Sequence, residues 1–138
     1  MHIKIGLNYR DGLYRYVHSS PEGAAFLAFF LLDDVGTRPH NIQRSLREMT
    51  SEEDEAQAHN ATQYAKEEGV QGIVTFMYEC DDEDEAMDKG YYFQIRADLV
   101  AQVLRGWEEQ VLKEKPQSIE ITIDGDNVKV VGVGKRVE

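Results

Sequence analysis

Apolar and polar residues alternate near the start of the chain, which is the pattern of a β-strand with one buried face. Residues 2–9 place four apolar or aromatic side chains on one side: Ile3, Ile5, Leu7 and Tyr9. Asp11 and Gly12 follow, and this pair favours a two-residue type I′ turn. The pattern therefore predicts a hairpin in which Ile5 lies opposite His18.

A second hairpin is expected near the end of the sequence. Isoleucine occupies every other position from residue 119 to residue 123, between polar residues. Gly125-Asp126 suits a type II′ turn, which takes glycine at its first central position. This turn would place Ile123 opposite Val128.

Three segments before residue 70 carry helical signals. Ser20-Pro21 predicts a helix start, and the helix that follows, to about residue 33, is apolar on every side. Such a helix is covered from several directions, or on one side by a second copy of the chain. Residues 39–49 space their apolar side chains for one helix face. The segment 50–53, Thr-Ser-Glu-Glu, has the form of a capping box, which predicts a surface helix over residues 51–68.

Two strands and a helix are expected after residue 69. Residues 70–78 are apolar on both faces, which is typical of a central strand, and residues 91–96 alternate. Residues 97–113 carry a helical apolar stripe made of Val100, Val103, Leu104, Trp107 and Val111. The order ββ-ααα-ββ-α-ββ predicts one α+β domain over residues 1–138, with an antiparallel sheet built from hairpins and with helices packed on one face.

Composition bounds the class of protein. The 138 residues are 41% hydrophobic and 30% charged, as in one globular domain. A single cysteine, Cys80, excludes an intrachain disulfide and a CxxC motif. The sequence opens without a signal-peptide pattern, and its longest apolar run, residues 24–32, is far shorter than the about 20 residues of a membrane helix. We therefore expect a cytoplasmic protein with no membrane contact.

The charge is distributed very unevenly. The chain has 26 acidic and 15 basic side chains, a net charge of -11, which argues against direct nucleic-acid binding. Residues 48–88 hold fourteen of the acidic side chains and only one basic side chain, Lys66. The segments before and after are close to neutral. The whole negative excess therefore lies in this one stretch, which we call the acidic segment.

Two acidic clusters make up most of the acidic segment. The first would occupy the opening turn of the helix expected from residue 51, where the helix dipole favours each carboxylate by ~0.3–1 kcal/mol. The second places six carboxylates within residues 81–88, and their mutual repulsion has to be screened by a partner, by metal ions or by salt. Tyrosines flank it, and aromatic anchors beside a charged rim are typical of interfaces. The candidate partner-binding residues are Glu52, Glu53, Asp54, Glu55, Tyr78, Glu79, Asp81, Asp82, Glu83, Asp84, Glu85, Asp88, Tyr91 and Tyr92.

The sequence carries no recognisable catalytic or metal-binding motif. An EF-hand starting at Asp82 would need Gly at position 6 and Glu at position 12, but Met87 and Phe93 stand there. The histidines lack zinc-site spacing, and no base is paired with Cys80 in the sequence. We therefore expect a binding protein and not an enzyme, with no cofactor and no metal.

The segment from Tyr78 to Tyr92, together with the size and the α+β pattern of the chain, resembles the small acidic immunity proteins of bacterial polymorphic toxin systems, particularly those of contact-dependent growth inhibition. This resemblance implies stoichiometric inhibition of a cognate toxin, commonly a basic nuclease, whose active site or a neighbouring surface is covered. Charge complementarity is compatible with that role, because it speeds association.

Other functions remain open from the sequence alone. The acidic segment also fits a nucleic-acid mimic or a regulatory adaptor that binds a host protein. A small-ligand or enzyme domain without a recognisable motif is a third alternative. Acidic surface that serves only solubility would give the same composition.

Overall fold

The computed structural model describes residues 1–8, 10–51, 55–59, 62–66, 72–78 and 92–134, with only the backbone described for 55–59, 62–66 and 78. Its strands form two antiparallel sheets of four. Sheet A has the order β2-β1-β7-β8 and sheet B the order β3-β4-β5-β6. Their bounds are β1 His2–Leu7, β2 Tyr14–Ser20, β3 Glu55–His59, β4 Thr62–Lys66, β5 Ile73–Tyr78, β6 Tyr92–Arg96, β7 Ser118–Asp124 and β8 Asn127–Val133.

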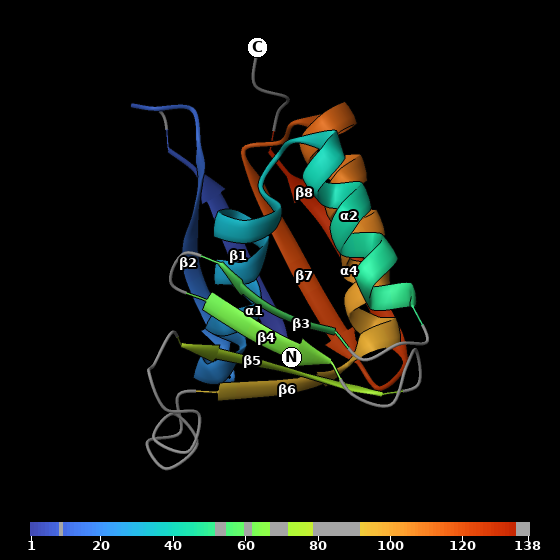
Figure 1. The fold of residues 1–138 in the computed structure, drawn as a ribbon. Helices are drawn as coiled ribbons and strands as arrows, with labels where there is room; N and C mark the ends of the chain where they lie inside the picture. Colours follow the sequence, from blue (N-terminus) through green and yellow to red (C-terminus); the bar gives the residue numbers. More distant parts are fainter. Residues whose placement is uncertain (9, 52–54, 60–61, 67–71, 79–91, 135–138) are drawn as a thin grey trace.

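The helices fill the space between and beside the sheets (Figure 1). The first helical segment comprises a short turn, Glu22–Ala24, helix α1, Ala25–Phe29, and a wider final turn, Phe30–Val35. Helix α2 spans Pro39–Thr50 and lies beside α4, which spans Ala97–Glu109 and is prolonged by a turn over Gln110–Glu114. The α+β class predicted from the sequence is confirmed, although the strands form two sheets and not one.

The first helical segment lies between the two sheets, which explains why it is apolar all round. Phe29 stacks on Tyr16 of β2, with ring centroids 5.4 Å apart. On the other side, Phe30 stacks on Phe76 of β5 at 4.9 Å. Apolar side chains on opposite sides of this segment therefore pack against both sheets of one chain, as expected for such a helix. Its predicted start shifts by one residue, because Ser20 belongs to β2 and Pro21 takes the N-cap position.

Helix α4 buries the whole stripe that the sequence predicts. Trp107 is fully buried, and its indole nitrogen donates a 2.8 Å hydrogen bond to the carbonyl oxygen of Gly36. Gly36 has φ 63° and ψ -149°, a conformation essentially restricted to glycine. The bond therefore fixes the sharp connection between the first helical segment and α2.

The N-terminal hairpin is present, but the register predicted for it is wrong. Ile5 pairs with Tyr16 and not with His18. The cause is a wider loop, in which the Asn8 amide donates to the Leu13 carbonyl oxygen and the Gly12 amide donates to the Asn8 carbonyl oxygen. The Asn8 side chain also accepts a bond from the Arg10 amide. The shift is two residues at Ile5 and, beyond a β-bulge, one residue at Lys4, and Ile3 and Ile5 are both fully buried, as the alternation predicts.

The helix predicted over residues 51–68 is wrong, because strands β3 and β4 lie there. Thr50 closes α2 and does not cap a new helix, since its hydroxyl donates to the Leu46 carbonyl oxygen at 2.8 Å. Ser51 is already extended, with φ -69° and ψ 146°. Pairing of β4 with β5 satisfies the backbone of a segment that has few large apolar residues to hold a helix in place.

The remaining predicted elements are confirmed. Strand β5 lies inside sheet B, between β4 and β6. In the C-terminal hairpin Ile123 pairs with Val128, and Gly125 has the positive φ of 60° that its turn requires. The hydrophobic pattern therefore predicted the hairpins at both ends of the chain, and it gave the wrong element for the segment that forms β3 and β4.

Replacing Trp107 tests the packing of α4. We expect Trp107→Ala to lower the free energy of unfolding by ~3–5 kcal/mol, because it removes the largest fully buried side chain. Trp107→Phe keeps an aromatic ring and should cost ~1–3 kcal/mol through the unpaired Gly36 carbonyl. Urea unfolding followed by circular dichroism measures both. A loss well under 1 kcal/mol for the alanine variant would contradict a buried Trp107.

Candidate functional site

The structure describes little of the acidic segment itself. Of the candidate partner-binding residues, the side chain is described for Tyr92 alone, which is half-buried at the start of β6 and pairs with Met77. Glu55 and Tyr78 are placed by their backbone, at the start of β3 and the end of β5. The other candidates lie outside the described residues.

The described residues next to the two acidic clusters lie at opposite ends of sheet B. Glu55, the last residue of the first cluster, pairs with Lys66 at one end of the sheet. At the other end Thr62 pairs with Tyr78, the residue that precedes the second cluster in the sequence. The chain enters β6 at Tyr92, which pairs with Met77.

Ion pairs tie the end of sheet B that holds Arg96 to the C-terminal hairpin. The Arg96 guanidinium contacts Asp98 at 2.9 Å and Asp126, in the β7–β8 turn, at 2.6 Å. The hydrogen bond from Arg96 lowers the pKa of Asp98 below its ordinary value. Because these groups are well exposed, the contacts orient the elements more than they stabilise them.

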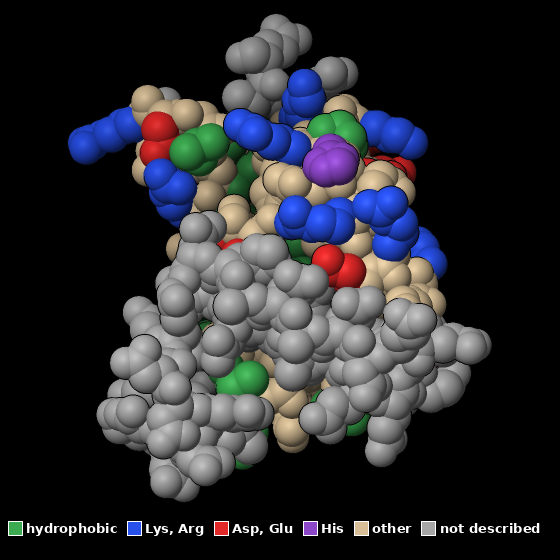
Figure 2. All heavy atoms as spheres, in the orientation of Figure 1, with side chains coloured by type: hydrophobic (Ala, Val, Ile, Leu, Met, Phe, Trp, Pro, Cys, Tyr) green, Lys and Arg blue, Asp and Glu red, His purple; other side chains and the backbone are tan. Residues whose placement is uncertain are grey.

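Basic side chains gather on a different part of the molecule. Figure 2 shows Lys and Arg side chains over the β1–β2 hairpin loop and helix α2. The arginines carried by these elements are Arg10, Arg15, Arg38, Arg44 and Arg47. Charge is thus segregated in the fold, with the acidic excess confined to the segment that contains β3, β4 and β5.

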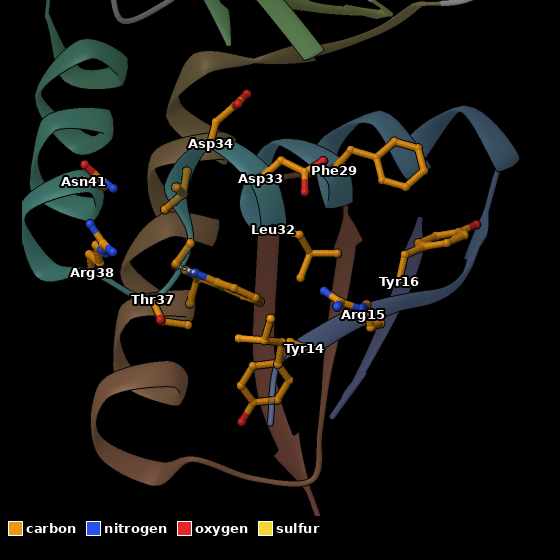
Figure 3. Close-up of a pocket in the computed structure, with 14 residues that line it drawn as sticks. Tyr14, Arg15, Tyr16, Phe29, Leu32, Asp33, Asp34, Thr37, Arg38 and Asn41 are labelled. Atoms are coloured by element: carbon orange, nitrogen blue, oxygen red, sulfur yellow. Dashed lines mark hydrogen bonds between the residues drawn. The ribbon is translucent and has the colours of Figure 1, made fainter. Parts of the chain in front are cut away.

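A pocket of about 620 Å³ opens beside these arginines, between β2 and the connection from the first helical segment to α2. Figure 3 shows Arg15 on the β2 side and Arg38 on the α2 side. Phe29 and Leu32 contribute apolar wall, and the buried Trp107 lies beneath the connection. The volume is within the ~300–1,000 Å³ typical of small-molecule sites.

Local structure explains the shape of this pocket. The Trp107–Gly36 bond holds one wall. Tyr14 holds another, because its hydroxyl donates to the Pro116 carbonyl oxygen at 2.6 Å and its ring meets Trp107 edge-on at 6.2 Å. Burial raises the pKa of the Tyr14 hydroxyl. Tyr14 is therefore a fixed structural donor at neutral pH.

Sequence analysis missed this pocket. Its lining comes from β2, the first helical segment, the start of α2 and α4, which are far apart in the sequence. Trp107 was identified only as a core residue. The signal in the sequence that could have indicated the pocket was the concentration of arginines in residues 10–47. It is weaker than the acidic excess of residues 48–88.

Asp34, at the edge of the pocket, is a buried carboxyl group. Only 7% of the residue is exposed, and neither carboxyl oxygen has a hydrogen-bond partner in the described structure. Burial, reinforced by neighbouring Asp33 and opposed by Arg44, raises the pKa of Asp34 from 3.8 to about 7. Asp34 is therefore largely protonated below neutral pH.

The described residues form neither a metal-binding cluster nor a membrane-spanning helix. Within the described residues, no three His, Cys, Asp or Glu side chains are grouped so that they could hold a metal ion. His2 and His18 stack at 5.4 Å, and Glu120 approaches His2 at 3.8 Å. None of the described helices has the length and apolar character needed to cross a bilayer.

Comparisons with known proteins give no match. No family model, no curated protein and no solved structure matches the chain. The function is therefore inferred from the residues and their arrangement.

The pKa of Asp34 predicts a pH-dependent difference between the native protein and Asp34→Asn. The unfolded chain releases this proton near pH 3.8 and the folded chain near pH 7, so the folded state binds more protons in between. The contribution of Asp34 to stability therefore falls as pH rises from 4 to 7. We expect the free energies of unfolding of Asp34→Asn and of the native protein to be most alike at pH 4. By pH 8 the value for Asp34→Asn should have risen relative to that of the native protein by up to about 4 kcal/mol.

Urea unfolding of both proteins at several pH values measures this difference, and Asp124→Asn is the matched control. Asp124 is an exposed aspartate at the end of β7 and is not among the groups that act on Asp34, so its variant should show a much flatter difference. A constant difference between Asp34→Asn and the native protein from pH 4 to pH 8 would contradict the raised pKa.

Proposed function

We propose that this protein is a protein-binding module whose acidic segment binds a basic protein, as an immunity protein neutralises a toxin. The observation that carries the proposal is the confinement of the negative excess to residues 48–88. Fourteen carboxylates in one stretch form a strong local field. A basic partner is the macromolecule that this field attracts.

The position of the acidic segment in the fold supports the proposal. Sheet A and the pair of helices α2 and α4 are built from residues outside most of this segment. The loop with the second cluster begins after Tyr78 and ends before Tyr92, on two strands that pair with each other. The residues on either side of the second cluster are therefore held in sheet B, which is separate from sheet A.

The chemistry also suggests what the partner does. A protein with a positively charged active-site cleft, such as a nuclease, presents the complementary surface. Electrostatic steering would speed formation of the complex and make its rate sensitive to salt. Inhibition would follow if the acidic segment covers the cleft that nucleic acid would otherwise occupy.

Charge reversal in the second cluster tests this function. We expect Asp82→Lys, Asp84→Lys and Glu85→Lys together to slow association with the partner by at least about tenfold at low salt, because steering is lost. The matched control reverses three exposed carboxylates elsewhere, Glu109, Glu114 and Asp124, and should change association much less. Circular dichroism checks that both variants fold.

The partner is identified first by capture on the native protein and elution with a salt gradient. The expected result is one basic protein at a one-to-one ratio, toxic when expressed alone and neutralised by the native protein but not by the Asp82, Asp84 and Glu85 variant. Equal neutralisation by that variant and by its control would refute the acidic segment as the binding surface. Recovery of many proteins released together at modest salt would favour the solubility alternative.

A further inference from the structure

The geometry points to a second binding site, in the pocket between β2 and α2, for a small organic anion that carries an aromatic ring. This inference does not depend on the acidic segment or on the function proposed for it. It rests on the combination of a partly apolar wall with two arginines that line the pocket, one on the β2 side and one on the α2 side.

The size and lining of the pocket favour a small molecule. A volume of about 620 Å³ accommodates a fused ring with one polar substituent. Phe29, Leu32 and the edge of Tyr16 supply apolar surface, and all three are only partly covered by the protein itself. An aromatic ring placed against them would bury surface that is now in contact with water.

The two arginines define the charge of the ligand. The Arg38 side chain is exposed, and its guanidinium forms no ion pair or hydrogen bond within the described part of the chain. Arg15 uses one nitrogen to contact Asp11 at 2.6 Å, in an exposed pair, which leaves further donors available. A guanidinium group matches the paired oxygens of a carboxylate or a phosphate.

The carboxyl groups at the pocket do not cancel this preference. Asp11 is already paired with Arg15, and Asp33 has an interaction of its own. Figure 3 shows the Asp34 side chain directed away from Arg15 and Tyr14. Arg38 and the remaining donors of Arg15 therefore stay available to an anion.

The start of α2 adds to the attraction for an anion. The helix has no side-chain cap and no acidic residue in its first turn, so its first amide groups and positive dipole end are uncompensated. Asn41, in that first turn, lines the pocket together with Arg38. An anion between the two arginines would lie close to this helix end.

A titration with 1-naphthoate tests the site, with 1-naphthalenemethanol as the uncharged probe of similar shape. Binding is followed by two-dimensional NMR at the indole N–H of Trp107, the single tryptophan, and at the Gly36 amide. We expect naphthoate to shift both signals and to bind at least about fivefold more tightly than the alcohol, because only the carboxylate pairs with the arginines.

Arginine variants locate the binding. Arg38→Gln and Arg15→Gln should each weaken naphthoate binding by at least about fivefold and leave binding of the alcohol nearly unchanged. Arg47→Gln is the matched control, since Arg47 is an exposed arginine at the other end of α2, and it should change binding less than about twofold. Thermal unfolding confirms that all three variants keep the native fold.

Several outcomes would overturn the inference. Unchanged Trp107 and Gly36 signals in the presence of naphthoate would contradict it, and so would equally tight binding of the alcohol. Equal weakening by all three arginine variants would indicate attraction by net charge and not by this pocket. Each of these results excludes a specific anion site between Arg15 and Arg38.

Discussion

The hydrogen bond from the Trp107 indole to the Gly36 carbonyl connects the main parts of this fold. It joins the last turn of α4 to the connection between the first helical segment and α2. Since Gly36 occupies a backbone conformation open mainly to glycine, the connection turns sharply and places the start of α2 opposite β2. The pocket and its two arginines are a consequence of that turn.

The fold could be predicted where large apolar residues recur at the spacing of a helix or of a strand. The stripe of α4 and the isoleucines of β7 each bury a continuous face, so one pattern was clearly favoured. Residues 55–66 contain mainly alanines and polar residues, whose spacing fits a helix or a strand equally well. The capping motif at Thr50 then favoured a helix. Pairing with β5 decided the outcome, and such long-range pairing is not encoded in a local motif.

The two candidate sites differ in how far a sequence can reveal them. The acidic segment was identified from the sequence because net charge is a property of the residues themselves. The pocket depends on Arg15 and Arg38 facing one space, which requires the turn at Gly36 and the packing of Trp107. Likewise Asp34 was an ordinary carboxylate in the sequence, and only burial in the fold raises its pKa.

The pairing of β1 with β7 has a consequence for how the chain folds. These strands lie side by side in the middle of sheet A but are separated by most of the sequence, so their contact closes a very large loop. Contacts of this kind form slowly because the entropy of the intervening chain is lost first. Until β7 pairs with β1, that edge of β1 has no partner strand, and an open strand edge can pair with another chain. The pairing of these two central strands is therefore expected to limit the rate at which sheet A closes.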